Sequence, residues 1–328
     1  MKALNPFFSI IIPVYNIEKY IERTILSILK NKFDDYEVIF INDGSTDNSL
    51  EIIKQYTNNS KLICVSQNTS GPSVARNYGL QLARGKYIFF IDGDDCITEN
   101  ALLTLYNKLE ESDIDLLVFG RINNYEKKQI VPYQLSNEEF FSAESYFRTS
   151  LNNSTFRTNV WDKIFRRELI ENYKLRFVNG LLYEDMFFLL QYLTYSKRIS
   201  VISEPLYLYT LSNQTSITKI LRKNDLDLLI FLDMAIQSVE NSKVLSKKSC
   251  YTMLQRFSLS SILHKYSFYY KTEADAKKII QILIQDYNFK KIVNYNIFHG
   301  LCLRDKLSAC LLKINYRFYL FLFILLNS

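Results

Sequence analysis

The chain has 328 residues, of which 48% are hydrophobic, enough to bury one large core or two ordinary ones. Its 8 glycines and 5 prolines exclude long flexible linkers, and its five scattered cysteines lack metal-ligand or redox spacing, as in a reduced cytosolic compartment. Residues 222–328 carry 16 Lys and Arg against 8 Asp and Glu, a charge of +8 within a net +6, which favours an anionic partner.

Short apolar runs alternate with amphipathic segments along the first 120 residues. The run FFSIIIPVYN predicts a buried strand, and IEKYIERTILSILKN, with apolar residues at three-to-four spacing, predicts a helix. The helix over 45–56 is expected to have Ser45 or Thr46 as its N-cap and Asp47 in its first turn. Predicted strands cover 7–16, 36–43, 61–68, 86–92 and 115–120, and predicted helices cover 17–31, 45–56, 70–85 and 99–112.

This alternation predicts an α/β fold, Rossmann-like, with a mostly parallel sheet and helices on both faces. From about residue 138 the pattern changes, and longer helices are predicted over 138–152, 160–172 and 183–196, with a strand over 198–210. After residue 221 the chain reads as helices only. We therefore expect a nucleotide-binding and catalytic domain over 1–220 and a helical C-terminal region over 221–328.

Acidic residues crowd the end of the fourth predicted strand, in KYIFFIDGDDCITEN. Asp92, Asp94 and Asp95 repel one another unless a cation neutralises them, and carboxylate oxygens suit Mg²⁺ or Mn²⁺. A solvated turn or a helix cap is the simpler explanation for a single such residue. Ligands of parallel sheets bind beyond the carboxyl ends of the strands, where Asn16 and Asp43 are also expected.

The phosphate-binding loops of dinucleotide-binding and P-loop proteins are absent, since the first glycine of the chain is Gly44. The charge of a diphosphate ligand would therefore be met mainly by a metal ion. Arg76, in SVARNYG, is a candidate to help, although an exposed helical arginine is an equal alternative.

Four separated motifs resemble, in order and spacing, those of the family-two glycosyltransferases. They are SIIIPVYNIEKYIERTILSIL, EVIFINDGSTDNS, NTSGPSVARNYGLQLARGKYIFFIDGDD and WDKIFRRELI followed by YEDMFFLLQYL. The resemblance covers roughly residues 8–209 and implies the GT-A fold. It also implies a nucleotide-sugar-dependent enzyme of the kind found in bacterial capsule, lipopolysaccharide and exopolysaccharide assembly.

The resemblance implies a role for each matching residue on the donor side. Asp43 matches the acid that binds uracil or ribose, and Asn42 departs from the second acid that the family often has there. Asp92 would contact the ribose or a metal-bound water, and Asp94 would bind Mn²⁺ or Mg²⁺. Asp95 would either support the metal ligands without touching the metal or be an alternate ligand. The other nucleotide-sugar-binding candidates are Pro13, Val14, Tyr15, Arg76 and Gly93.

On the catalytic side, Glu184 and Asp185 match the acidic pair that contains the general base. Asp185 is the expected base and Glu184 the alternative, although acids at a helix start are usually partners of the helix dipole. Trp161 and Lys163 match the acceptor side, where Trp161 would stack on a sugar, unless it is a core residue.

The predicted function is metal-dependent, inverting transfer of a hexose or N-acetylhexosamine from a UDP-sugar to a glycan or lipid-linked oligosaccharide. One alternative is a sugar-phosphate nucleotidyltransferase, which should carry a glycine- and arginine-rich loop that PVYNIEKY lacks. Another is a non-enzymatic membrane-binding or nucleic-acid-binding module. Nucleic acid is not expected as a partner, because the acidic groups repel phosphate backbones. Homo-oligomerisation is left open.

The apolar run from Phe318 to Leu326 has nine residues, whereas a membrane-spanning helix needs about 20. Because Lys306, Lys313 and Arg317 precede it, one expectation is an interfacial anchor on anionic lipid. The other is a terminal helix packed on the core or on another subunit. The expected location is cytoplasmic, peripheral on the inner face of the cell membrane.

Overall fold

The computed structural model describes residues 5–125, 128–153, 155–181, 183–211, 227–240, 242 and 244–254. The chain divides into two compact units. The larger takes in Met1–Ala143 and Arg157–Leu221, and the smaller takes in Glu144–Phe156 and Arg222–Ser328. The expected domain boundary between residues 220 and 221 lies outside the described residues and stays a prediction.

Four parallel strands form the first half of the sheet in the larger unit, in the order β3-β2-β1-β4. They are β1 (Phe8–Val14), β2 (Tyr36–Asn42), β3 (Leu62–Ser66) and β4 (Tyr87–Phe90). Val14 pairs with Asn42, and Ile11 pairs with Phe90, so the carboxyl ends of β1, β2 and β4 lie at one edge. β1, β2 and β4 are almost wholly buried, as the apolar runs predicted, whereas only Leu62 of the edge strand β3 is buried.

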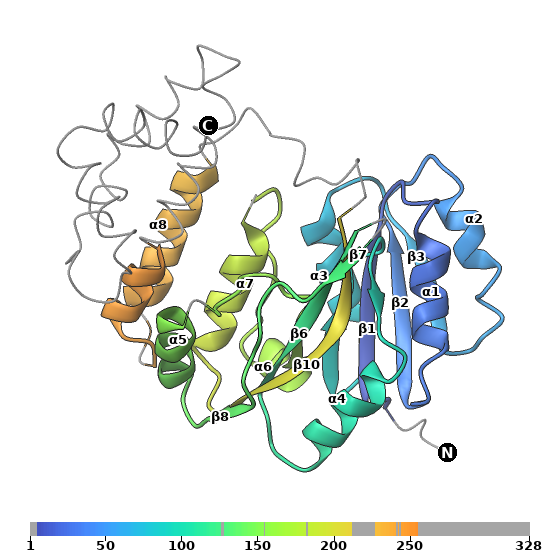
Figure 1. Ribbon diagram of the computed structural model, residues 1–328. Coiled ribbons are helices and arrows are strands. Elements are labelled where there is room, and N and C mark those ends of the chain that lie inside the picture. The colour runs from blue at the N-terminus through green and yellow to red at the C-terminus, as the bar shows by residue number, and fades with distance from the viewer. Residues whose placement is uncertain are drawn as a thin grey trace, which may run out of the picture. The chain divides into compact units, whose positions relative to one another are not determined.

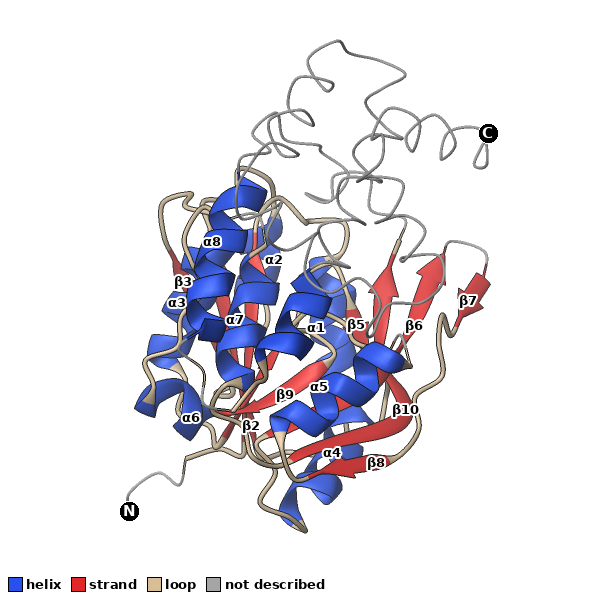
Figure 2. Ribbon diagram, turned by 90° about the vertical axis from the view of Figure 1, so that its left-hand side faces the viewer, coloured by secondary structure: helices blue, strands red, loops and turns tan. Residues whose placement is uncertain are grey.

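The second half of the sheet is mixed and continues in the order β9-β6-β10-β5. β9 runs antiparallel between β4 and β6, whereas β10 is parallel to β6. β7 pairs antiparallel with β6, and β8 pairs antiparallel with β10 (Figure 2). These strands are β5 (Cys96–Ile97), β6 (Leu116–Tyr125), β7 (Lys128–Ile130), β8 (Glu138–Phe140), β9 (Lys163–Arg166) and β10 (Ile199–Thr210).

Helices cover both faces of the sheet (Figure 1). Alternate β1 residues, beginning with Phe8, join one core cluster with apolar residues of α1 (Ile21–Leu29) and α4 (Ala101–Glu110). On the opposite face, α3 (Pro72–Leu82) packs so closely that a Cβ on Gly79 would lie 2.3 Å from Ile11 Cγ2. The remaining helices of this unit are α2 (Ser49–Lys54), α6 (Arg167–Asn172) and α7 (Glu184–Leu193).

The smaller unit contains α5 (Ala143–Asn152), α8 (Asp227–Glu240) and a helical stretch over 247–254. The Glu144 carboxylate ties the start of that stretch to α5 by accepting hydrogen bonds from the Ser246 and Ser249 hydroxyls, at 2.8 and 2.6 Å. No helix in the described part of the chain is long and apolar enough to cross a membrane. The apolar run Phe318–Leu326 lies outside the described residues.

The predicted α/β architecture is confirmed, but three local predictions are wrong. Residues 160–172 do not form one helix: Lys163–Arg166 is the buried strand β9, because pairing on both sides outweighs its helical periodicity. The helix expected over 138–152 begins only after β8. The helix expected to begin near Thr46 is α2, which begins at Ser49. Asp47 precedes it and accepts a hydrogen bond from the Ser49 amide at 3.0 Å.

Candidate active site

The turn after β1 and the acidic loop after β4 lie against each other at the carboxyl edge of the sheet. The Asp43 amide, just after β2, donates to the Val14 carbonyl at 2.8 Å. A Cβ on Gly93 would lie 2.4 Å from Ile17 Cδ1 and 3.1 Å from the Pro13 carbonyl oxygen. A side chain at position 93 would therefore force the Ile17 side chain to shift and would crowd the Pro13 carbonyl.

Arg76 of α3 joins three of the expected acids. Its Nη1 lies 2.9 Å from Asp185 Oδ1 and 3.2 Å from Glu184 Oε1, and its Nη2 lies 3.1 Å from Asp92 Oδ1. The guanidinium is 5% exposed and stacks over the ring of Phe177. One cation thus connects α3, the loop after β4 and the first turn of α7.

The protonation of this cluster depends on burial and on its crowded charges. Burial raises the pKa of Asp185 to about 7, with Glu184 and Asp92 adding to the increase and Arg76 opposing it. Burial also raises the pKa of Glu184. The three carboxylates hold the pKa of Arg76 above its ordinary value, so Arg76 stays charged. The Val160 amide also donates to Asp185 and helps to orient it.

The buried side chain of Asp95 anchors the acidic loop to β10 and is not accessible to a ligand. Its Oδ2 accepts the Tyr207 hydroxyl at 2.8 Å, and its Oδ1 accepts the Thr210 amide at 2.7 Å. Only 1% of Asp95 is exposed, and burial followed by the charges of Asp94 and Asp92 raises its pKa well above the ordinary value. The expectation of Asp95 as a metal ligand is therefore corrected to a structural role.

Helix α1 holds the same loop through its backbone. The Thr24 hydroxyl donates to the carbonyls of Gly93 and Asp95, at 2.9 and 2.6 Å. Arg23 Nη2 donates to the Asp94 carbonyl at 2.6 Å. Neither residue was expected at the site, because helical periodicity says nothing about a partner about 70 positions away. The loop is fixed from α1 and β10 before any ligand binds.

Asp43 organises the start of α3, the helix that carries Arg76. Its Oδ1 accepts the Ser70 amide at 2.8 Å, and its Oδ2 accepts the Gly71 amide at 2.8 Å. Gly71 has φ +91° and precedes Pro72, the first residue of α3. Asp43 therefore orients this helix, whatever contact it makes with a nucleotide. Tyr15 is 48% exposed at the same edge.

The two residues expected on the acceptor side are both buried. Trp161 is 6% exposed and stacks on Tyr207 and Tyr209, with ring centroids 4.5 and 5.1 Å apart. Lys163 is fully buried, and its Nζ donates to the Asn159 carbonyl at 2.7 Å and to the Asp162 carboxylate. Neither presents a surface for a sugar, so the structure favours the core alternative for Trp161 and a supporting role for Lys163.

The negative charge of this site suits a divalent cation, but the described side chains do not supply a complete set of metal ligands. Arg76 and its three carboxylates sum to −2 when all are ionised, and Asp94 is nearby in the same loop. No three Asp, Glu, His or Cys side chains of the described residues converge as a metal site. Asp92 and Asp94 would therefore share a cation with ligand oxygens and water, as Mg²⁺ sites in phosphate-binding proteins do.

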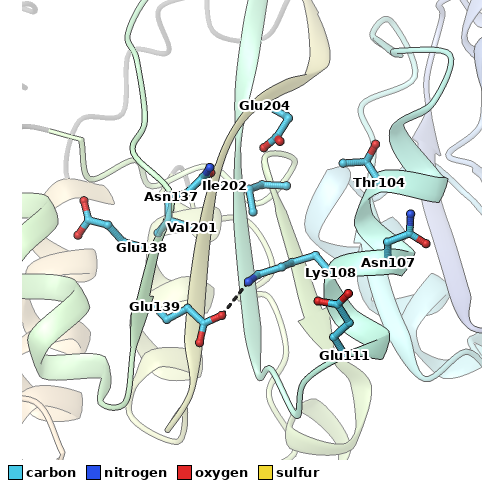
Figure 3. Close-up of a pocket in the computed structure, with 10 residues that line it drawn as sticks. All are labelled: Thr104, Asn107, Lys108, Glu111, Asn137, Glu138, Glu139, Val201, Ile202 and Glu204. Atoms are coloured by element: carbon cyan, nitrogen blue, oxygen red, sulfur yellow. Dashed lines mark hydrogen bonds and ion pairs between the residues drawn. The ribbon is translucent and has the colours of Figure 1, made fainter.

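A separate hollow of about 400 Å³ lies between α4, β8 and β10 (Figure 3). Val201 and Ile202 line it together with four glutamates, and Lys108 reaches across to Glu139 at 2.7 Å. It contains none of the expected site residues. Because its charged lining is mostly acidic, a nucleotide diphosphate would be repelled there.

Known proteins are similar to this chain in sequence. Residues 9–174 match the model of Glycosyl transferase family 2. The chain is 34% identical over 227 residues to the uncharacterized glycosyltransferase EpsJ of Bacillus subtilis, covering 68% of this chain and 66% of EpsJ. It is 33% identical to the poly(ribitol-phosphate) beta-N-acetylglucosaminyltransferase TarP of Staphylococcus aureus, covering 59% of each chain. The matches thus span less than two thirds of these relatives.

Solved structures agree on the fold. A crystal structure of S. aureus TarS 1–349 superimposes with a TM-score of 0.75 at 22% identity, covering 97% of this chain and 90% of that one. The same TarS fragment with UDP-GlcNAc gives 0.70 at 20% identity, with the same coverage. The GT-A fold expected from the motifs is confirmed. The chain belongs to glycosyl transferase family 2.

Proposed function

We propose that this chain transfers a hexose or N-acetylhexosamine from a UDP-sugar to a hydroxyl of a glycan acceptor, with inversion, in bacterial surface polysaccharide synthesis. The observation that carries the proposal is the Arg76 cluster, in which acids from two separate motifs, Asp92 and the pair Glu184 and Asp185, meet within 3.2 Å of one guanidinium. Family membership favours this over a nucleotidyltransferase or a non-enzymatic module. The relative TarP is named as a β-transferase, consistent with inversion of an α-linked donor.

The donor would lie along the carboxyl edge of the sheet. Tyr15, with Pro13 and Val14 in the same turn, would face the base, and Asp43 at the end of β2 would bind the uracil or ribose. Asp92 and the backbone of Gly93 would border the ribose and diphosphate. This assignment rests on the proximity of these segments and on the exposed ring of Tyr15.

Asp185 would act as the general base. Its carboxylate takes the proton of the acceptor hydroxyl while that oxygen attacks the anomeric carbon, and the bond to the diphosphate breaks with its electron pair leaving on UDP. A base works best with a pKa near the working pH, and burial raises the pKa of Asp185 to about 7. Arg76 and the Val160 amide hold this carboxylate in place.

Asp94, with Asp92, would hold Mn²⁺ or Mg²⁺. When bound, such a cation stabilises the negative charge that develops on the departing diphosphate. The net negative charge of the cluster supports this role.

We also propose that the protein acts at the cytoplasmic face of the membrane on a lipid-linked acceptor. This proposal rests on the sequence alone, through the +8 charge of residues 222–328 and the apolar run Phe318–Leu326. Co-sedimentation of the full chain with phosphatidylglycerol vesicles at low salt tests it. Equal recovery with neutral phosphatidylcholine vesicles would count against an anionic membrane partner.

Release of UDP without acceptor tests the catalytic proposal. The full chain is incubated with UDP-glucose, UDP-galactose, UDP-GlcNAc, UDP-GalNAc and, for comparison, GDP-mannose, with Mn²⁺ or with EDTA. We expect slow UDP release from at least one UDP-sugar and none from GDP-mannose. Asp94→Ala should lose the Mn²⁺-dependent part of donor binding.

Asp185→Asn should retain donor binding and lose turnover by a factor of about 10² to 10⁴, the range for general bases. Asp35→Asn is the matched control, because Asp35 is an exposed aspartate at the amino end of β2, whereas the site lies at the carboxyl ends of the strands. Normal turnover of Asp185→Asn would refute the assignment of the base, with Glu184 then the next candidate.

A further inference from the structure

Lys163, the first residue of β9, carries a charge that the proposed mechanism leaves unused. Its side chain is completely buried, and burial lowers its pKa, with Asp162 and then Asp185 opposing the decrease. β9 runs antiparallel to β4, so the turn over 159–162 that precedes β9 lies at the carboxyl edge of the sheet. An ammonium group buried this close to the proposed base is costly unless its charge and its N–H donors are matched.

Hydrogen bonds among three residues close this turn. Lys163 Nζ donates to the Asn159 carbonyl at 2.7 Å and to Asp162 Oδ1. The Asn159 side-chain amide donates to Asp162 Oδ2 at 2.9 Å, so both carboxylate oxygens of Asp162 have a partner. The Asp162 carbonyl accepts the Phe119 amide of β6 at 3.1 Å, which ties the turn to the sheet. The Asn159 carbonyl is therefore held in a fixed position.

The peptide group between Asn159 and Val160 connects Lys163 to the proposed base. Its carbonyl oxygen accepts the Lys163 ammonium group, and its N–H, which belongs to Val160, donates to the Asp185 carboxylate. In a trans peptide the C=O and the N–H point in opposite directions, so the cation and the carboxylate lie at opposite ends of one planar group. Val160 and Lys163 are both 0% exposed, so water does not compete for these bonds.

A cation on the carbonyl oxygen strengthens the hydrogen bond that the same peptide group donates. The cation draws electron density toward the oxygen and leaves the N–H more positive, and hydrogen bonds in a chain polarise one another in this way, most strongly away from water. A stronger bond from the Val160 amide favours the ionised form of Asp185, which is the form that accepts a proton. It also fixes the direction in which the carboxylate faces.

We propose that Lys163 is a positioning residue for the base, because it acts through the Asn159–Val160 peptide to orient the Asp185 carboxylate and to keep it ionised. The inference rests on the proposed function, since it gives Lys163 a part in the same proton transfer. Lys163 touches neither donor nor acceptor in this role. The buried ion pair with Asp162 balances the charge that the role requires.

Other charges around Asp185 come from other elements. Arg76 of α3 pairs with it at 2.9 Å, and the charges of Glu184 on α7 and of Asp92 in the loop after β4 also act on it. Substitution of Lys163 leaves these three residues in place. A change in the behaviour of Asp185 in such a variant is therefore attributable to Lys163.

The sequence allows this peptide group to be observed alone, because Asn159-Val160 is the only Asn-Val pair in the chain. In the full chain labelled with ¹³C at asparagine carbonyls and ¹⁵N at valine amides, one NMR signal connects the Asn159 carbonyl with the Val160 N–H. Its amide proton should move as the pH rises through about 7 and Asp185 ionises. Asp185→Asn should abolish that movement. A signal that ignores pH, or that responds equally in Asp185→Asn, would overturn the proposal.

Lys163→Met removes the charge and keeps the length of the side chain. It should shift the Asn159 carbonyl and Val160 amide resonances together and raise the midpoint of the pH titration by about 0.5–1 unit. Lys108→Met is the matched control, because Lys108 pairs with Glu139 in the separate hollow, and it should change neither resonance. A carbonyl that shifts while the amide and its midpoint stay the same would show that Lys163 only supports the turn, which refutes the proposal.

Lys163→Met leaves the buried Asp162 without its cation and risks unfolding the chain. The variant Asp162→Asn/Lys163→Met removes both charges, and replacing a buried ion pair by neutral groups is often tolerated. Its net charge is unchanged, and the long-range effects of the two lost charges on Asp185 oppose each other. A raised midpoint in this variant supports the route through the peptide group, and an unchanged midpoint would refute it.

Kinetics give a readout that a purely structural role would not move. With a UDP-sugar that the unmodified protein consumes, Lys163→Met should lower kcat for UDP release about tenfold with little change in the donor KM, because its hydrogen bonds lie within the 159–163 segment. A raised KM with an unchanged kcat would contradict positioning of the base. If the unmodified protein releases no UDP, the proposed function fails, whereas the NMR titration needs no substrate and still decides the role of Lys163.

Discussion

Replacing Asp185 by asparagine should change how the stability of the protein depends on pH. The Asp185 carboxyl has a pKa of about 7 in the folded chain against an ordinary 3.8, so folding favours its protonated form. Its contribution to stability is therefore full below about pH 3.8 and is lost as the pH rises through 7. Asparagine has no proton to lose, so the variant should lack this part of the pH dependence.

The magnitude follows from the two pKa values. Between pH 5 and pH 8, values of about 7 and 3.8 predict a loss of about 2–3 kcal/mol in the free energy of unfolding. The Asp185 side chain is 23% exposed, so solvent partly screens its charge and the change of about 2–3 kcal/mol is an upper bound.

Urea unfolding of the full chain at pH 5 and pH 8 measures the effect. The stability of Asp185→Asn relative to the unmodified protein should increase by 1 kcal/mol or more on going from pH 5 to pH 8. Asp35→Asn, an exposed aspartate, should show no such change. If Asp185→Asn kept the pH dependence of the unmodified chain, burial would not raise the pKa of Asp185. The pKa argument for Asp185 as the general base would then fail.

Two further predictions concern the acidic loop. Gly93→Ala should lower the free energy of unfolding by about 1–3 kcal/mol, because its Cβ would lie 2.4 Å from Ile17 Cδ1. Adding Ile17→Ala should recover part of this loss, and no recovery in urea unfolding would argue against the clash. Tyr207→Phe removes the bond to Asp95 and the bond from the Asp92 amide, at 2.8 and 3.1 Å. It should cost about 1–3 kcal/mol and raise the KM for the donor sugar, whereas a change in stability with an unchanged KM would separate the loop from the donor.

The sequence predicted the first half of the sheet well, because each of its strands is a continuous apolar run. That regularity also placed Asp43 and Asp92 at one edge, since parallel strands end together. The second half was harder. β9 carries helical periodicity and becomes a strand only through its neighbours β4 and β6, which no local pattern reveals.

The orientation of the site acids could not be read from spacing. Asp94 and Asp95 are adjacent in sequence, yet Asp95 turns inward because Tyr207 and Thr210, more than 110 positions away, provide its hydrogen bonds. Arg76 was expected near a nucleotide, but its three carboxylate partners were not. Trp161 was expected either on a sugar or in the core, and it is packed among tyrosines. Long-range partners decided each of these outcomes.

The Arg76 cluster also links assembly of the site to the completion of folding. Its partners come from segments separated by up to 109 positions, on either side of β9. Contacts so distant in sequence form only after the intervening chain has been ordered, and they tend to form late. A chain arrested with only the β1–β4 half in place would leave Arg76 with Asp92 alone and would lack the proposed base Asp185, so an incompletely folded molecule would have no means of consuming donor.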